Sequence, residues 1–176
     1  MIKKIFALLP VLLLAACGGK ENFSPNEEPG MQLAQKVSIF ESKDSQKKWI
    51  LEAEEVDFAD LSSAVLKNPV LLLKENGKDS AKVTGNYGTF DYGKKLVGIR
   101  GDAKAESFTQ AVTIAAEEFF YDVDKDRVWS DVKTVVTRGG VKVTARGGVE
   151  TDSKLNRIEL KKQTTQLPLD AKELKH

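Results

Sequence analysis

Residues 134–143 read TVVTRGGVKV, two β-branched runs on either side of a glycine pair. β-Branched side chains favour strands, and a Gly-Gly pair supplies the positive φ angles that a two-residue hairpin turn requires. The segment therefore predicts an antiparallel β-hairpin in the last third of the chain.

The same two-residue period runs back through the chain to Ala34. In residues 47–54, KKWILEAE, the side chains of Trp49, Leu51 and Ala53 occupy every second position, which is the spacing that lines one face of a strand. Residues 111–120 contain the helix formers Ala and Glu, but their β-branched start and aromatic end favour a strand. The pattern predicts an all-β domain of antiparallel strands.

Four segments resemble one another, and each has an apolar residue, one spacer, a small residue and further apolar positions. The segments are LEAEEVDF (51–58), VTGNYGTF (83–90), IAAEEFFY (114–121) and VTARGGVE (143–150). Their small residues are Ala53, Gly85, Ala116 and Ala145, which lie 32, 31 and 29 residues apart. A polar turn and a return strand follow each segment, at residues 64–73, 96–105, 127–136 and 155–163. Internal repeats of this length indicate stacked units.

About four such units predict a rolled or V-shaped pair of sheets with open edges at both ends of the stack. A small residue at one fixed place in each unit has two interpretations. It allows facing sheets or ligand chains to approach the backbone closely, or it accommodates large neighbours in an ordinary filled core. An open edge can also accept a strand from another protein.

Composition excludes several classes of function. Lys and Arg number 27 against 26 Asp and Glu, so the basic field that binds nucleic acid is absent. The sequence has one His, at position 176, and one Cys, at position 17, which leaves no imidazole on an internal scaffold for catalysis or zinc binding. No phosphate-binding G-x-x-x-x-G-K-[ST] motif occurs. We expect a protein that is not an enzyme and has no catalytic residues, metal site or cofactor.

The first residues predict export from the cytoplasm and attachment to a membrane. A basic start at Lys3 and Lys4 precedes a short apolar run to Ala16, which is typical of a secretory signal peptide. Residues 14–17, LAAC, match the bacterial lipobox, and by that resemblance Cys17 is acylated after cleavage of residues 1–16. Two or more acyl chains make a stable membrane anchor. Residues 17–32 then form a flexible tether, and residues 166–176 form a flexible tail.

Several short motifs, in this order, resemble the LptC/OstA-like family of lipopolysaccharide export proteins. They are Phe40, Trp49-x-Leu51-x-Ala53, Asn68-Pro69-Val70, Tyr121-Asp122 and Ser130-x-x-Lys133. The resemblance implies an antiparallel β-jellyroll over residues 33–165, with an apolar groove for the acyl chains of lipid A. It also implies docking to an inner-membrane ABC transporter of the LptB/LptF/LptG type and to an LptA-like periplasmic protein. ATP hydrolysis would then belong to a partner.

The lipobox departs from the family pattern, in which an uncleaved N-terminal helix lies in the inner membrane. The resemblance places this chain on the periplasmic side of the cell envelope, anchored by lipid. The family favours the inner membrane, whereas Gly18 after the acylated cysteine leaves the outer membrane open.

The two-residue alternation of apolar side chains predicts which residues line the groove. They are Leu51, Ala53, Phe58, Val83, Gly85, Phe90, Ile114, Ala116, Phe120, Val143 and Ala145. The last repeated unit is predicted to expose the terminal edge of the stack, to which the LptA-like partner would bind. This edge comprises Val141, Val143, Val149, Leu155, Ile158 and Leu160. The alternative is that the groove residues are simply the core of a closed β-sandwich, and that the protein is a structural or adaptor lipoprotein.

Overall fold

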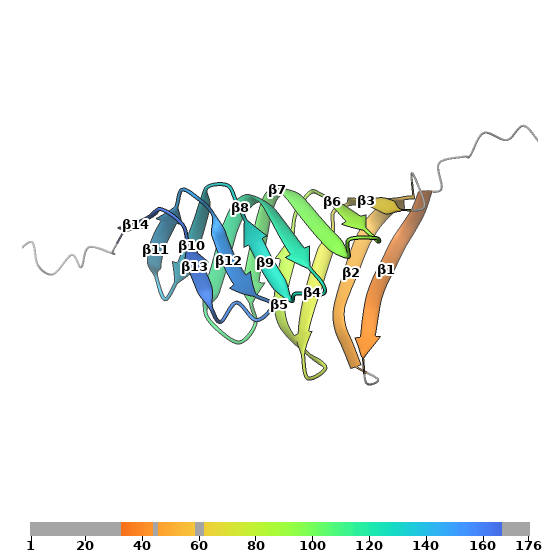
Figure 1. The fold of residues 1–176 in the computed structure, drawn as a ribbon, viewed down its shortest axis with the longest axis horizontal. Coiled ribbons are helices and arrows are strands. Elements are labelled where there is room, and N and C mark those ends of the chain that lie inside the picture. Colours follow the sequence, from red (N-terminus) through yellow and green to blue (C-terminus); the bar gives the residue numbers. More distant parts are fainter. Residues whose placement is uncertain (1–32, 44–45, 59–61, 167–176) are drawn as a thin grey trace, which may run out of the picture. The chain divides into compact units, whose positions relative to one another are not determined.

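The computed structural model describes residues 33–43, 46–58 and 62–166, which form fourteen antiparallel strands in one continuous sheet (Figure 1). The strands are β1 (Leu33–Lys43), β2 (Gln46–Asp57), β3 (Ser63–Lys67), β4 (Val70–Glu75), β5 (Lys78–Thr84), β6 (Tyr87–Asp91), β7 (Leu96–Ser107), β8 (Val112–Asp122), β9 (Arg127–Ser130), β10 (Thr134–Arg138), β11 (Val141–Ala145), β12 (Val149–Asp152), β13 (Ile158–Leu160) and β14 (Gln163–Gln166). The predicted signal peptide, Cys17, the tether and the tail beyond Gln166 lie outside the described residues.

The sheet folds into two layers because its long strands change partners halfway along. Residues 49–52 of β2 pair with β4, whereas residues 55–57 pair with β3. Likewise β7 pairs with β5 near its end and with β6 near its start, and β8 pairs first with β10 and then with β9. The first layer therefore contains β4, β5, β10, β11 and β14, and the second contains β3, β6, β9, β12 and β13.

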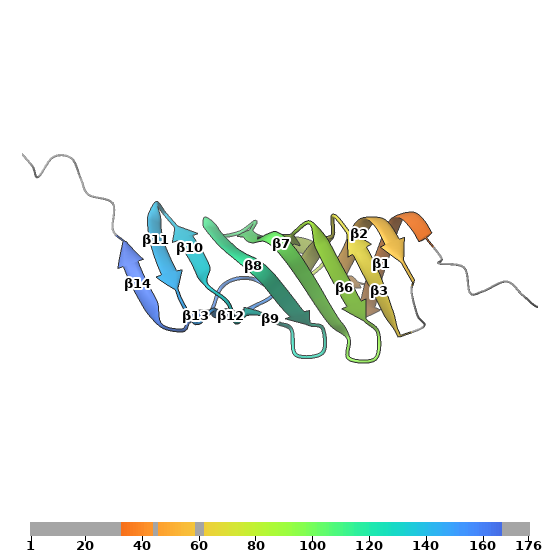
Figure 2. The same cartoon turned by 90° about the horizontal axis from the view of Figure 1, so that it is seen from above.

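We call the line where the chain passes between the layers the fold line. The opposite side, the mouth, is bordered by the turns of both layers. These are residues 76–77, 108–111 and 139–140 from the first layer, and residues 92–95, 123–126 and 153–157 from the second. Figure 2 shows β10, β11 and β14 side by side at the end of the stack opposite β1. The fold is an antiparallel β-jellyroll, and the prediction of an all-β protein is confirmed.

The four repeated units are the strand pairs of this stack. Each outgoing run starts at the mouth in the first layer, crosses the fold line and ends in the second layer. The outgoing runs are β2, β5–β6, β8 and β11–β12, and the return runs are β3–β4, β7, β9–β10 and β13–β14. Interruptions at the fold line split five of these eight runs into two strands each, and β1 completes the fourteen.

Small residues line the fold line. Ala103 of β7 pairs with Ala116 of β8, which pairs with Thr134 of β10, and Thr134 pairs in turn with Ala145 of β11. At Gly85, a Cβ atom would lie 2.6 Å from Cγ2 of Ile99 and 2.8 Å from the carbonyl oxygen of Arg100. Real Cβ contacts are not this short, so the backbones approach here as closely as small residues permit. Of the two interpretations of the repeat, this geometry supports close approach of backbone to backbone.

The hairpin predicted around the Gly-Gly pair is confirmed. Arg138 pairs with Val141 across a two-residue turn in which Gly139 and Gly140 have φ angles of 56° and 85°. Two positive φ angles define the turn type that matches the twist of a β-hairpin. The segment with mixed signals, residues 111–120, is strand β8 from Val112 onward.

One predicted groove residue, Phe120, does not face the interior, because strand β8 crosses from one layer to the other. In the first layer β8 turns Val112 and Ile114 inward, but in the second layer it turns Phe119 and Tyr121 inward. The inward positions shift by one residue where the strand crosses the fold line, so Phe120 lies on the outer face. Strict alternation from Ile114 could not detect this shift.

The predicted partner edge also needs correction. β11 lies between β10 and β14, and β12 lies between β9 and β13, so Val141, Val143 and Val149 are not on an edge strand. Leu155 is fully buried in the turn after β12. Ile158 and Leu160 do lie on a strand, β13, with one partner among the described strands. The error arises because β14 returns to the first layer and covers β11.

Candidate functional site

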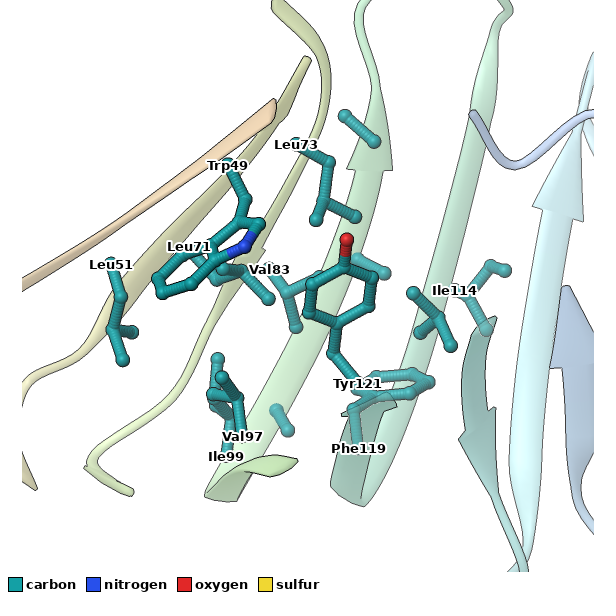
Figure 3. Close-up of a cluster of buried hydrophobic side chains, with 14 of the residues drawn as sticks. Trp49, Leu51, Leu71, Leu73, Val83, Val97, Ile99, Ile114, Phe119 and Tyr121 are labelled. Atoms are coloured by element: carbon teal, nitrogen blue, oxygen red, sulfur yellow. The ribbon is translucent and has the colours of Figure 1, made fainter. Parts of the chain in front are cut away.

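The interior between the two layers is apolar. The first layer contributes Leu51, Leu71, Val83 and Ile114, and the second contributes Val97, Ile99, Phe119 and Tyr121 (Figure 3). None of these side chains is more than 4% exposed. Burial of this kind removes apolar surface from water, which stabilises the domain by about 25 cal/mol for each Å².

This interior is filled. The space between Leu71, Val83, Phe119 and their neighbours offers no room for a water molecule. The two layers thus pack directly on one another, as in a β-sandwich core. A ligand can enter only if the layers separate or their side chains rearrange.

A hollow opens at the mouth, between the turn regions of the two layers. Its volume is about 450 Å³, and its apolar lining residues are Trp49 from the first layer and Tyr121 and Val123 from the second. Charged side chains surround them, among them Glu41, Lys48 and Asp124. The hollow leads from a polar rim to the apolar interior.

The two large rings at the mouth are amphipathic. The Trp49 Nε1–H donates a hydrogen bond to Glu41 Oε2 (3.3 Å), and the Tyr121 hydroxyl donates one to Asp126 Oδ1 (3.2 Å). The rest of each ring is buried, with 4% exposed in both residues. Burial, followed by the nearby Asp126 carboxylate, raises the pKa of Tyr121, so its hydroxyl remains a neutral donor. Each ring presents a polar tip to the rim and an apolar body to the interior.

The residues predicted for the groove fall into three groups. Those buried within the domain are Leu51, Ala53, Val83, Phe90, Ile114 and Ala145. Those partly exposed are Phe58, Gly85, Ala116 and Val143, and of these Phe58 and Ala116 pack against the core. Phe120 is the third case, on the outer face.

The sequence analysis did not include Trp49, Leu71, Phe119 or Tyr121 among the residues that face the interior between the layers. Trp49 shares its alternation with Leu51 and Ala53, so the pattern contained that signal. The aromatic pair Phe119 and Tyr121 could be found only with the shift at the fold line.

On the outer face, Phe120 takes part in a separate cluster. Its ring stacks on Trp129 with centroids 5.4 Å apart and an interplanar angle of 29°. The guanidinium of Arg127 lies 4.3 Å from the Trp129 ring centroid, and that of Arg100 lies 5.5 Å from the Phe120 centroid. Such cation–π contacts stabilise the outer surface of the second layer.

In the described parts of the chain, no group of three or more His, Cys, Asp or Glu side chains is placed to hold a metal ion. Those parts also contain no helix long and apolar enough to span a membrane. The feature that remains is the filled apolar interior between the two layers, which meets the hollow at the mouth. We call this region between the layers the cleft.

These features define an antiparallel β-jellyroll with an apolar interior and an amphipathic mouth. The family model for lipopolysaccharide assembly, LptC-related, matches residues 15–167, and the chain belongs to this LptC-related family. The family description assigns it to lipopolysaccharide assembly.

The chain is similar to the crystal structure of LptH, the LptA-homologous periplasmic component of the lipopolysaccharide transport device from Pseudomonas aeruginosa. That likeness has 17% identity and a TM-score of 0.46, and covers 74% of this chain and 80% of LptH. No curated protein sequence matches the chain.

Proposed function

We propose that this protein binds lipopolysaccharide by its acyl chains, in the cleft between the two layers, and passes it on without catalysing a reaction. The acyl chains would replace side-chain contacts in the apolar interior, and the sugar and phosphate groups would remain at the charged rim. The observation that carries this proposal is the mouth, where Trp49 and Tyr121 join a polar rim to a predominantly apolar interior.

The energetics favour a ligand with several chains. Each buried CH₂ contributes about 0.8 kcal/mol, so a few acyl chains offset the cost of parting two packed layers. Extraction of the same chains from a membrane costs a comparable amount. A net movement therefore requires a partner that hydrolyses ATP, and the chain itself has no P-loop motif.

Partners would join at the two ends of the stack. Among the described strands β1 pairs only with β2, while at the other end β13 pairs only with β12 and β14 only with β11. Exposed edges of this kind accept strands from other chains. We infer that an ABC transporter of the LptB/LptF/LptG type docks at the β1 end, and an LptA-like protein at the end formed by β13 and β14. The corrected edge residues for the LptA-like protein are Ile158 and Leu160.

The proposal extends to the membrane anchor. Cleavage before Cys17 and acylation of that cysteine would hold the jellyroll on the periplasmic side of a membrane. A tether of about 15 residues has a root-mean-square reach of about 20 Å. A protein that receives lipopolysaccharide from the transporter would be anchored in the inner membrane. Because Gly18 follows the acylated cysteine, the outer membrane is the alternative location.

Photo-crosslinking in cells tests the binding site, with a photoreactive residue placed at Phe90 or, separately, at Phe120. Phe90 is 5% exposed between the layers, whereas Phe120 is a phenylalanine on the outer face and provides a matched control. We expect a lipopolysaccharide adduct at Phe90 that depends on cellular ATP, and none at Phe120. Equal labelling at both positions, or labelling at Phe120 alone, would contradict the proposed site.

A closed adaptor is the second candidate function, and the filled interior favours it. In that case the two layers never part, and the protein acts through its edges and outer faces alone. The Phe90 probe would then yield no lipid adduct in a folded, lipidated protein, whereas probes on β13 or β14 would still capture protein partners.

A further inference from the structure

The turn between β12 and β13 crosses the mouth and joins the two layers. We call residues Ser153–Asn156 the strap. Its backbone carbonyls face hydroxyl groups of the first layer. Ser107 Oγ donates to Lys154 O (3.5 Å), and Ser80 Oγ shares its one proton between Leu73 O (2.9 Å) and Ser153 O (3.3 Å). The Lys154 ammonium also pairs with the Glu75 carboxylate. The strap begins in the second layer, so these contacts hold the two layers together.

Two further contacts fix the ends of the strap. Ser153 Oγ donates to Asp126 Oδ2 (2.8 Å), and that carboxylate also accepts the hydrogen bond from the Tyr121 hydroxyl. Near the other end, the side-chain amide of Gln110 donates to Asn156 Oδ1. The strap is thus linked to Tyr121 at the open hollow and to the turn between β7 and β8.

Leu155 is the central residue of the strap and is fully buried, with 0% exposed. It has a φ angle of 56°, a left-handed conformation that is uncommon for residues with a side chain. An ordinary exposed turn would place Gly or Asn at such a position. Here a large apolar side chain adopts it and packs into the hydrophobic core.

We propose that the strap is a latch on the cleft and that Leu155 is its plug. This inference rests on the proposed function, because it concerns how acyl chains move through the same cleft. In the strand order, the strap meets the first layer at β5 and at the β7–β8 turn, with β2 and β4 on one side and β10 and β11 on the other. An acyl chain that enters at the open hollow cannot reach the interior under β10 and β11 until Leu155 withdraws.

The contacts suit a latch. The fold line on the opposite side is continuous backbone, so the layers can part only at the mouth. There the strap is held by an ion pair whose side chains are 36% and 42% exposed and by hydrogen bonds of 3.3 and 3.5 Å. The exposed ion pair contributes little because water screens it. The two hydrogen bonds are weak because they are long, although Ser80 and Ser153 are buried. Besides these contacts, opening must break the hydrogen bond from Gln110 to Asn156 and expose the apolar side chain of Leu155 to water, which is unfavourable. Within the described residues, no ladder of backbone hydrogen bonds joins the strap to the first layer, so the burial of Leu155 is its main hold.

A crosslinked latch tests this inference in the full-length, lipidated protein. Cysteines replace both members of the ion pair, Glu75→Cys and Lys154→Cys, and a short bis-maleimide bridges them. The sequence has no other cysteine than Cys17, which is acylated under the proposed function and so does not react. Photoreactive residues at Leu71, on the hollow side of the strap, and at Val136, on the far side, report how far lipopolysaccharide advances.

Bridging should lower the ratio of Val136 adduct to Leu71 adduct at least fivefold relative to the same double variant without the reagent. The single variant Lys154→Cys, which cannot be bridged, should give the same ratio with and without the reagent. In the opposite sense, Leu155→Ala should raise that ratio severalfold, and Leu155→Met, which preserves side-chain volume, should not. If the Leu71 adduct forms but the Val136 adduct is indifferent to bridging, the latch is wrong and the proposed function stands. If neither position labels in the unbridged protein, the proposed function fails, and the latch fails with it.

Discussion

Trp49 in the first layer and Phe90 in the second make an edge-to-face contact across the cleft, with ring centroids 5.6 Å apart and an interplanar angle of 67°. The Tyr92 ring continues this arrangement 4.8 Å from Phe90. Aromatic pairs in this geometry contribute about 0.5–1.5 kcal/mol beyond their burial. The contact is one of the interactions that must break when the layers part.

A double-mutant cycle measures that contact. Trp49→Ala should lower the free energy of unfolding by about 3–5 kcal/mol, as should Phe90→Ala. Because the rings touch, the two changes together should deviate from additivity by about 0.5–1.5 kcal/mol in urea denaturation. Trp49→Ala combined with Phe120→Ala is the control: Phe120 lies on the outer face, so this pair should add within about 0.5 kcal/mol.

A methyl group added at the fold line should be poorly tolerated. Gly85→Ala places a Cβ atom 2.6 Å from Cγ2 of Ile99, and overpacking of this kind costs about 1–3 kcal/mol of stability. Gly93→Ala is the matched control because its nearest neighbour, Asp91 Oδ1, would be 3.6 Å away; we expect a change within about 0.5 kcal/mol. Equal stability of the two variants in thermal and urea unfolding would show that the fold line is not closely packed.

Two adjacent phenylalanines should respond in opposite ways to a charge. Phe119→Asp buries an unpaired carboxylate in the core, where Phe119 is 1% exposed, and should cost more than about 4 kcal/mol. Phe120→Asp loses only the stacking on Trp129 and the contact with Arg100, and should cost about 1 kcal/mol. Far-ultraviolet circular dichroism and urea denaturation separate the two. A folded Phe119→Asp protein beside an unfolded Phe120→Asp protein would reverse the assignment of faces in β8.

Stability should fall in alkaline solution, in part through Tyr121. Burial raises the pKa of Tyr121 in the folded protein above its ordinary value of 10.0. The folded state therefore keeps a proton that the unfolded state loses, so the contribution of Tyr121 is complete below pH 10 and declines above it. Tyr121→Phe should reduce the loss of unfolding free energy between pH 9 and pH 11. Since several lysines titrate in the same range, the measured quantity is the difference between the two proteins, and identical slopes would contradict this role for Tyr121.

Local patterns predicted much of this fold. The Gly-Gly hairpin, the strand at residues 112–122 and the four repeated units follow from β-branched runs, turn residues and internal similarity, all of which act over a few residues. The groove residues were predicted less well. Periodicity identifies one face of a strand, but a strand that crosses between layers changes its inward face, as β8 does between Ala116 and Phe119.

Which strands lie at the ends of the sheet depends on contacts between residues far apart in the sequence. Val141 and Val143 belong to the last repeated unit, so the sequence suggested a strand at the edge of the sheet. In the structure β14 pairs with β11 and covers this edge. Leu155 offers a similar case. In the sequence it begins a return strand, whereas in the structure it is a buried residue in the turn that crosses the mouth.

The sequence by itself determined the strands, the turns and the number of repeated units, because the φ/ψ preferences of Gly and β-branched residues and the two-residue period are local properties. Tertiary structure alone decided which face of each strand points inward, which strands are left at the ends, and how the strap at Leu155 joins the layers. These features depend on contacts between residues as far apart as Glu75 and Lys154. Such contacts form only when the sheet has folded on itself, so no local pattern encodes them.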